Sequence, residues 1–257
     1  MCAICGCGHD HEHDHHHDHD HHHDHDHHDH HHEHDHHHGH EGRVIRLERD
    51  LLAKNNLLAE RNRGWFAGRG VVAFNLVSSP GAGKTTLLER TIRDLQGAAP
   101  IVVIEGDQAT DRDARRVRAA GARAVQINTG TGCHLDAAMV AKVLPELDPP
   151  KGALLFIENV GNLVCPALFD LGEAKRVLVV SVTEGDDKPY KYPHMFRSSD
   201  LVVLSKEDLL AHVPFDVDAF TTAAREVRPG VEILRLSATR GDGLERWYAW
   251  LRGQGTA

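Results

Sequence analysis

Ser78-Ser-Pro-Gly-Ala-Gly-Lys-Thr-Thr86 stands between an apolar run, VVAFNLV at residues 71–77, and a segment of helical composition. A strand, a glycine-rich turn and a helix in that order form a phosphate-binding loop, in which successive backbone N–H groups at the helix N-terminus surround a phosphate. The usual pattern G-x-x-x-x-G-K-[ST] has glycine where this chain has Ser78. The context predicts a phosphate-binding loop in spite of that departure.

The residues of this loop have distinct predicted roles. Lys84 is expected to reach the β- and γ-phosphate oxygens, and the Thr85 hydroxyl is expected to bind Mg²⁺. Small residues allow the backbone N–H groups to approach the β-phosphate closely. The other loop residues assigned to the nucleotide are Gly81, Ala82, Gly83 and Thr86.

Six more β-rich runs follow along the chain, and stretches of helical composition separate several of them. The runs are IVVIEGD, AVQIN, ALLFIEN, RVLVVSV, LVVLS and VEILRLS. The helical stretches are residues 86–95, 112–120, 135–147 and 217–227. Strands that alternate with helices are joined by right-handed crossovers into a parallel sheet. We therefore predict an α/β phosphate-loop NTPase fold with a mostly parallel seven-stranded sheet flanked by helices.

Three residues near the ends of later strands are candidates for the same site, because open α/β sheets bind ligands at the carboxyl ends of their strands. Asp107 ends the run IVVIEGD and is placed to hold magnesium, directly or through water. Glu158 and Gly161 lie at the end of ALLFIEN, where a glycine N–H is expected to sense the γ-phosphate. Lys84, Thr85 and Asp107 are the predicted catalytic residues. Ordinary strand-end solvation is the alternative for Asp107 and Glu158.

The segment LSKED at residues 204–208 is similar to the N-K-x-D element with which GTPases read guanine, with Ser205 in place of the asparagine. An aspartate at the position of Asp208 accepts hydrogen bonds from guanine N1 and N2, which adenine cannot donate. The tripeptide SAT after the last strand resembles the loop that supports the base. The pattern favours GTP over ATP. The residues assigned to the base are Lys206, Asp208, Ser237 and Ala238.

Composition divides the chain into three segments. Residues 1–42 hold 21 of the 24 histidines, together with 11 acidic residues and no Lys or Arg. A segment so poor in apolar residues is expected to be disordered. Residues 43–70 place leucines at helical spacing and predict an amphipathic helix and a connector. Residues 71–257 are the predicted GTPase domain.

Charge and hydropathy exclude two classes of partner. The formal net charge of −9 comes from the first segment, since residues 43–257 hold 27 acidic and 29 basic residues. A nucleic-acid-binding protein would show a basic stripe or patch. The sequence has neither an apolar run of about 18 residues nor the start of a secretory signal. We expect a cytoplasmic protein that binds neither nucleic acid nor membrane.

Met1-Cys-Ala-Ile-Cys-Gly-Cys7 places three thiols within seven residues, close enough to wrap one ion. Thiolate and nitrogen donors suit planar Ni²⁺ as well as tetrahedral Zn²⁺, so the spacing of Cys2, Cys5 and Cys7 leaves the ion open. The histidines that follow are neutral above about pH 6.5 and are expected to hold several ions weakly. An affinity tag and a solubilising acidic tail are the alternatives for this tract, but a tag is a short pure-His run and an acidic tail does not explain the histidines.

Cys133 and His134 stand together before a predicted helix, and Cys165 lies four residues beyond Gly161. A single buried cysteine is usually a small hydrophobic residue. Two thiols and an imidazole next to a nucleotide sensor instead favour a metal site. Three ligands from one chain leave one coordination position open, or invite a second chain to complete the site.

Over essentially the whole chain, the sequence resembles the HypB family, the nickel-incorporation GTPases of hydrogenase maturation. The motifs that carry the resemblance are the N-terminal C-x-x-C-G-C, the His-rich tract, NLVSSPGAGKTTLL, IEGD, TGTGCHLDAAMV, IENVGNLVCPALFDLGE, VTEGDDKPYKYPHMF and LSKEDLL. The resemblance implies a tight nickel site at the three N-terminal cysteines and a nucleotide-linked nickel or zinc site at Cys133, His134 and Cys165. It also implies a GTP-dependent homodimer, a HypA-type metallochaperone partner, and delivery of nickel to the large subunit of [NiFe]-hydrogenase.

Three other functions compete with this interpretation. The related urease-accessory GTPases also combine a His-rich start with a phosphate loop, but their metal motif is Cys-Pro-His, whereas Cys133 and His134 are adjacent here. A nickel or zinc storage protein and an ATP-dependent metabolic kinase are the second and third. The expected function is a GTP-hydrolysing nickel metallochaperone whose His-rich tract stores nickel. Hydrolysis is expected to be slow, because the sequence identifies no residue that positions the attacking water.

Overall fold

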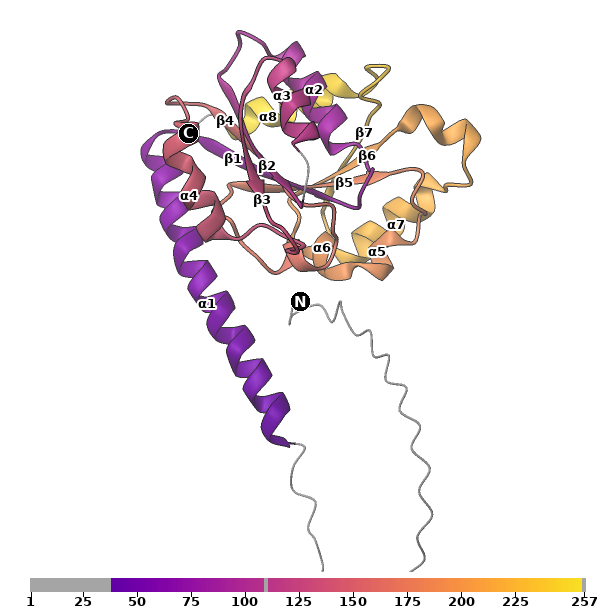
Figure 1. The fold of residues 1–257 in the computed structure, drawn as a ribbon. Helices are drawn as coiled ribbons and strands as arrows, with labels where there is room; N and C mark the ends of the chain where they lie inside the picture. The colour runs from indigo at the N-terminus through magenta and orange to yellow at the C-terminus, as the bar shows by residue number, and fades with distance from the viewer. Residues whose placement is uncertain (1–37, 109–110, 256–257) are drawn as a thin grey trace, which may run out of the picture.

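The computed structural model describes residues 38–108 and 111–255, with side chains from residue 49 on. Seven parallel strands form one sheet in the order β3-β2-β4-β1-β5-β6-β7 (Figure 1). The predicted fold is confirmed, and each of the seven β-rich runs is a strand. The strands are β1 (Val72–Ser78), β2 (Ile101–Asp107), β3 (Arg123–Asn128), β4 (Leu154–Glu158), β5 (Lys175–Ser181), β6 (Leu201–Ser205) and β7 (Glu232–Arg235).

Helices connect most of these strands. The α-helices are α1 (His38–Gly68), α2 (Lys84–Asp94), α3 (Arg112–Ala119), α4 (Ala137–Leu147), α5 (Lys188–Lys191), α6 (Pro193–Ser198), α7 (Val217–Val227) and α8 (Leu244–Gln254). Two 3₁₀ helices are η1 (Cys165–Ala167) and η2 (Glu207–His212). The sequence patterns predict α1, α2, α3, α4 and α7. They miss α5 and α6, which are short, and α8, although its buried residues Leu244, Trp247, Tyr248 and Leu251 stand at helical spacing.

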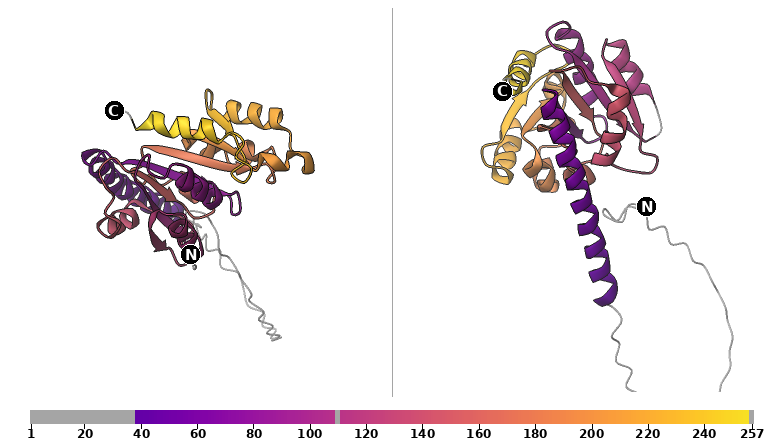
Figure 2. Two further views of the ribbon diagram at one scale, coloured as in Figure 1. Left: turned by 90° about the horizontal axis from the view of Figure 1, so that it is seen from above. Right: turned by 90° about the vertical axis from the view of Figure 1, so that its left-hand side faces the viewer.

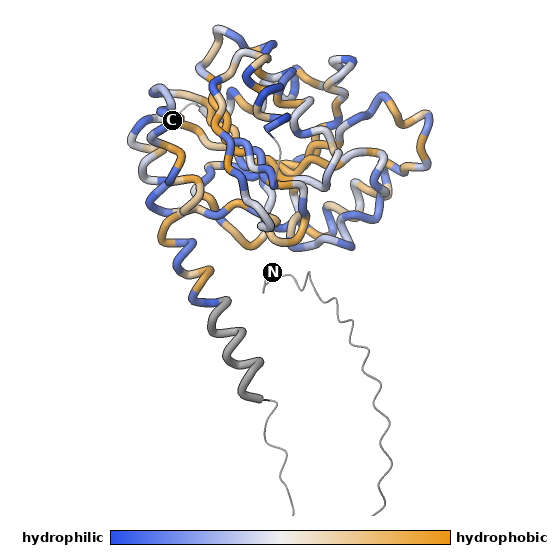
Figure 3. Tube along the Cα trace, viewed as in Figure 1, coloured by the Kyte–Doolittle hydropathy of each residue, from blue (hydrophilic) through white to orange (hydrophobic). Residues whose placement is uncertain are grey.

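Each face of the sheet is covered by helices, so the core forms two layers. Successive strand residues point to opposite faces. In β4, Phe156 packs in a cluster with α2, α3 and α8, while the next residue, Ile157, packs in a cluster with α1 and α4. A third cluster places α6 and α7 on β5 and β6. Figure 2 shows the helices on both sides of the sheet, and Figure 3 shows the hydrophobic segments gathered at the centre of the domain.

The first turns of α1 extend away from the domain, and its later turns pack against α4 (Figures 1 and 2). Between residues 38 and 108 and between 111 and 255, no helix has the length and apolar character needed to cross a bilayer. The three N-terminal cysteines and nearly all of the His-rich tract lie outside the described residues.

The strands that follow β1 in the chain lie on both sides of it in the sheet. β2 and β4 lie on one side of β1, and β5, β6 and β7 lie on the other. A crevice forms at the carboxyl ends of parallel strands where the chain reverses its direction across the sheet. The loop from β1 to α2, which holds the glycine-rich sequence, lies at that point.

Candidate functional site

The glycine-rich loop has the backbone conformation that a phosphate requires. Gly81 and Gly83 have φ angles of +74° and +104°, which glycine adopts at little cost. Gly83 caps α2, so the first N–H groups of that helix point into the loop. The loop borders a cavity of about 490 Å³, which is lined by Gly81, Ala82, Gly83, Lys84, Thr85 and Thr86 among others.

A buried serine compensates for the one departure from the loop pattern. Ser78 is fully buried, and its Oγ accepts a hydrogen bond of 2.6 Å from Lys84 Nζ. Lys84 itself is only 7% exposed, so its amine is held inside the cavity. A serine hydroxyl thus gives the lysine a polar partner that a glycine side chain would lack. On the other side of the loop, Lys206 Nζ donates to Gly81 O at 2.7 Å.

Two buried carboxyl groups face the cavity beside the loop. Thr85 Oγ1 donates to Glu158 Oε1 at 2.8 Å, and Glu105 lies against Glu158. Burial and the neighbouring Glu158 raise the pKa of Glu105 to about 11, and burial also raises the pKa of Glu158. Each carboxyl group keeps one buried oxygen, Oε2, that has no hydrogen-bond partner. A pair of this kind fits a divalent cation, because hard oxygen ligands next to a hydroxyl suit Mg²⁺.

Sequence reasoning missed Glu105. It lies two residues before Asp107 in β2, so the two side chains share one face of the strand. A charged residue inside an otherwise apolar strand was the signal that could have identified it. Asp107 lines the same cavity, and its Oδ1 accepts a hydrogen bond from Gln108 N at 2.6 Å.

The segment after β4 packs directly on the glycine-rich loop. A Cβ added to Gly161 would lie 2.9 Å from Pro80 Cα, which no real side chain tolerates. Asn159, Val160 and Gly161 line the nucleotide cavity. A displacement of the backbone at Pro80 therefore displaces Gly161 directly, because no residue lies between them.

A second, smaller cavity of about 170 Å³ adjoins the first and shares Gly83, Thr86 and Lys206 with it. Asp208 and Ala238 also line this cavity, and Asp208 Oδ1 is buried without a hydrogen-bond partner. A buried carboxylate oxygen of this kind is suited to a donor on a ligand.

Ser205, which departs from the usual base-binding motif, and Ser237 both make hydrogen bonds within the protein. Ser205 Oγ donates to Ala82 O at 2.6 Å and so ties β6 to the glycine-rich loop. Ser237 is not among the residues that line the smaller cavity. Its Oγ lies 3.0 Å from Thr239 Oγ1 and accepts from Arg240 N, which shapes the loop after β7.

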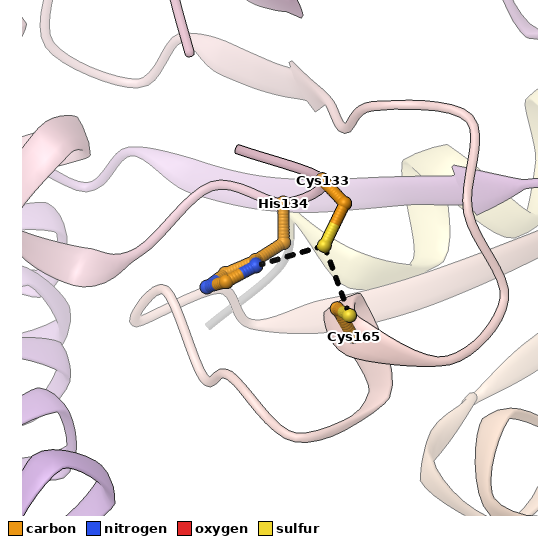
Figure 4. Close-up of side chains that lie close together, drawn as sticks. All are labelled: Cys133, His134 and Cys165. Carbon is orange, nitrogen blue, oxygen red and sulfur yellow. Dashed lines mark hydrogen bonds between the residues drawn. The ribbon is translucent and has the colours of Figure 1, made fainter. Parts of the chain in front are cut away.

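Cys133, His134 and Cys165 come together into one cluster (Figure 4). The Sγ atoms of Cys133 and Cys165 are 3.0 Å apart, and Cys133 Sγ lies 3.7 Å from His134 Nδ1. The three ligand atoms all lie within 4.8 Å of one another. Two soft thiols and a borderline imidazole at this spacing suit Ni²⁺ or Zn²⁺.

The surroundings of the cluster favour its ligand form. Cys165 is buried at the start of η1, while Cys133 and His134 are half-buried in the loop before α4. The His134 ring stacks on Phe169 with ring centroids 4.0 Å apart. Burial lowers the pKa of His134, so the neutral imidazole that binds metals is favoured.

Two hydrogen bonds join the nucleotide cavity to the segment that carries Cys133 and His134. Asn159, which lines the cavity, accepts a hydrogen bond at Oδ1 from Leu135 N (3.1 Å). Gln108, also in the cavity wall, donates from Nε2 to Gly132 O (3.3 Å). The residues on each side of the Cys-His pair are thus held by residues of the nucleotide cavity.

The chain is similar in sequence and in fold to known proteins. Residues 72–235 match the family described as CobW/HypB/UreG, nucleotide-binding domain. The hydrogenase maturation factor HypB of Azotobacter vinelandii is 57% identical over 212 residues, which cover 82% of this chain and 70% of that protein. The crystal structure of HypB from Archaeoglobus fulgidus has a TM-score of 0.74 and 43% identity, covering 79% of this chain and 100% of that one. The crystal structure of HypB from Helicobacter pylori in complex with nickel has a TM-score of 0.74 and 38% identity, covering 79% and 95%.

Proposed function

Since the chain belongs to the HypB family of hydrogenase maturation factors, we propose that it is a GTP-hydrolysing metallochaperone that binds Ni²⁺ and delivers it during maturation of [NiFe]-hydrogenase. One observation carries the proposal. Asn159 lines the nucleotide cavity and accepts a hydrogen bond from Leu135 N, the residue next to His134. The side chain of Asn159 therefore connects the nucleotide cavity to the segment that carries the metal cluster.

The loop residues bind and orient the phosphates of GTP. Gly81, Ala82 and Gly83 present backbone N–H groups to the β-phosphate, and Lys84 leaves Ser78 to pair with the phosphate oxygens. Gly161 reports the presence of the γ-phosphate through its contact with Pro80. Hydrolysis is slow in the isolated chain, because catalysis of phosphoryl transfer depends on positioning and on charge stabilisation that a second subunit or partner often completes.

Thr85, Glu158, Glu105 and Asp107 would hold the Mg²⁺ that accompanies the nucleotide. Their fit rests on the two buried, unpartnered carboxylate oxygens beside the Thr85 hydroxyl. When bound, Mg²⁺ neutralises charge on the phosphate oxygens. The protein supplies the carboxylates at a buried position, where their attraction for a cation is weakly screened.

Nickel is the cargo in this proposal, and Cys133, His134 and Cys165 bind it. The nickel complex of the Helicobacter pylori relative supports this choice of metal over zinc. Cys2, Cys5 and Cys7 form a second, tight nickel site, and the His-rich tract stores further ions. A GTP-dependent homodimer, a HypA-type metallochaperone and the hydrogenase large subunit are the proposed partners.

The proposed coupling predicts that nickel affinity at the internal cluster depends on the bound nucleotide. Replacing Cys2, Cys5 and Cys7 by alanine in the full chain leaves two thiols, at Cys133 and Cys165. This protein, in which three cysteines are replaced, is called the three-cysteine variant. Its thiolate-to-nickel charge-transfer absorption then reports the internal cluster alone. We expect the Ni²⁺ dissociation constants with GDP and with a non-hydrolysable GTP analogue to differ by about 5- to 150-fold, the usual range of coupling between two sites.

The reciprocal measurement is the control for that experiment. Linkage requires Ni²⁺ to change the ratio of affinities for the two nucleotides by the same factor. Asn159→Ala is expected to reduce both factors, and Asn162→Ala, close by on the same loop, is expected to leave them unchanged. Equal nickel affinity with both nucleotides would contradict the coupling.

The carboxylate of Asp208 is expected to set the choice of base. In Asp208→Asn, an amide N–H replaces one of the oxygens that accept from guanine, so the preference for GTP over ATP should fall by about 1–3 kcal/mol, the value of a good bidentate contact to a base. Competition of GTP and ATP against a fluorescent GDP analogue measures this change. Glu207→Gln is the matched control on the neighbouring residue. An unchanged preference would show that another group reads the base.

A further inference from the structure

Two buried asparagines on α1 bridge Ala137, the first residue of α4, to the loop after η1. Asn55 accepts a hydrogen bond at Oδ1 from Ala137 N (2.9 Å) and donates from Nδ2 to Asp170 O (2.8 Å). Asn62 donates from Nδ2 to Ala137 O (2.9 Å) and to Leu171 O (3.1 Å). Each asparagine therefore bonds to the first residue of α4 and to the loop after η1, and α1 lies alongside α4 in Figure 1.

The burial of these amides is unusual for polar residues. Asn55 is 5% exposed and Asn62 is 2% exposed, whereas the neighbouring Asn56 is exposed. A buried amide is costly unless its hydrogen bonds are made, and an apolar residue would fill the same helix face more favourably. The two asparagines are thus explained by the backbone groups that they hold, not by packing.

The loop after η1 lies against α1 with no space to spare. A Cβ added to Gly172 would be 2.5 Å from Ala59 O. Arg63 adds two hydrogen bonds of 2.6 Å, to Asp170 Oδ2 and to Glu173 O. This contact fixes the loop on the helix at several consecutive residues, so the loop cannot slide along α1.

The bonded residues are close in sequence to the proposed metal ligands. Ala137 lies three residues after His134, and Asp170 directly follows Phe169, on which the His134 ring stacks. Cys165 begins η1, five residues before Asp170. A shift of either loop on α1 would change the separation of the two thiols and the tilt of the imidazole.

We propose that Asn55 and Asn62 are positioning residues for the metal site, which hold the Cys133-His134 loop and the Cys165 loop at the spacing that one ion requires. Removal of a group that orients a metal ligand typically lowers metal affinity by about 10- to 100-fold. The proposal rests on the proposed function, because it takes the same three side chains as the nickel ligands. It adds that α1, which does not touch the nucleotide cavity, sets the geometry of the site.

The test replaces each asparagine by leucine in the three-cysteine variant, with Asn56→Leu as the matched control. We expect Asn55→Leu and Asn62→Leu to alter the charge-transfer spectrum and to weaken Ni²⁺ binding by about 10-fold, the low end of what loss of a direct ligand partner costs, because the asparagines act through Ala137 and the loop after η1. Asn55→Asp keeps the acceptor for Ala137 N and loses the donor to Asp170 O. Its Ni²⁺ affinity should therefore lie between that of the parent and that of Asn55→Leu. Asn56→Leu should match the parent.

A second readout measures the thiol separation without metal. The yield of the Cys133–Cys165 disulfide at equilibrium in a glutathione redox buffer reports how readily the two thiols are bridged, and an equilibrium yield does not depend on access of a reagent to the buried Cys165. We expect less bridging in both leucine variants, at temperatures where thermal unfolding shows them to be folded. If they do not fold, Asn55→Asp carries the test.

The outcomes separate the two proposals. Folded asparagine variants with the parent's nickel affinity, spectrum and bridging yield would overturn the positioning role. A parent protein that binds no nickel at Cys133 and Cys165 would contradict the proposed function, whereas the bridging yield would still test whether α1 sets the spacing of the thiols.

Discussion

Lys84→Ala is expected to reduce GTP hydrolysis by about 100- to 1000-fold, the usual cost of removing one preorganised donor to a developing negative charge. Lys84 is buried, and its amine sits in the cavity within 2.6 Å of Ser78 Oγ. The other two basic residues that line this cavity in the described part of the chain are already paired, Lys206 with Gly81 O and Arg116 with Glu89 and Asp113. Phosphate release from GTP in single-turnover assays measures the effect.

The control is Lys142→Ala, which removes an exposed lysine of α4 that does not line the nucleotide cavity. Lys84→Ala also distinguishes delivery of nickel from storage of nickel. Lys84→Ala should keep the nickel stoichiometry of the parent and lose delivery of nickel to hydrogenase. Delivery at the parent's rate in Lys84→Ala would favour a protein whose main role is to hold metal.

Cys133→Ser is expected to reduce and shift the nickel-thiolate absorption of the three-cysteine variant, because only Cys165 keeps a thiol, and to weaken Ni²⁺ binding by more than the roughly 10- to 100-fold that loss of an outer partner costs. The serine oxygen is a harder donor than thiolate and is not deprotonated at neutral pH, so it is a poor ligand for nickel. Cys133 is half-buried, which makes the substitution easier to accommodate than one at the fully buried Cys165. Chelator competition gives the dissociation constant.

His134→Ala should cause a comparable loss, and His194→Ala, at an exposed histidine of α6, provides the matched control. A Cys133→Ser protein with an unchanged absorption band would show that Cys165 alone supplies the thiolate and that Cys133 is not a ligand.

The sequence predicts the sheet well because its strands are buried on both faces. The runs IVVIEGD and RVLVVSV have nearly continuous apolar residues, which is typical of parallel strands covered by helices. Helix starts were less accurate than helix ends: the stretches predicted at 86–95 and 135–147 begin at Lys84 and Ala137. α1 continues through Gly64 to Gly68, because Phe66 is buried in the core and offsets the cost of a glycine in a helix, about 1 kcal/mol.

The sequence also predicts which residues meet at the candidate sites, because the carboxyl ends of parallel strands lie along one edge. It does not reveal Glu105 or Asn159 as bridging residues, since their importance depends on partners from distant parts of the chain. Asn55 and Asn62 look like the polar face of an amphipathic helix. Only the packed structure shows that both are buried and bonded to Ala137 and to the loop after η1.

The length of α1 bears on how an ion could travel within one chain. At about 1.5 Å of rise per residue, His38 lies about 26 Å along the helix axis from Asn55, where α1 contacts the loops of the internal cluster. The backbone at the first turn of α1 therefore lies further from Cys133 and Cys165 of the same chain than a side chain can reach. An ion bound at that turn passes by direct contact only to a neighbouring molecule, and the rate of such transfer should rise with protein concentration.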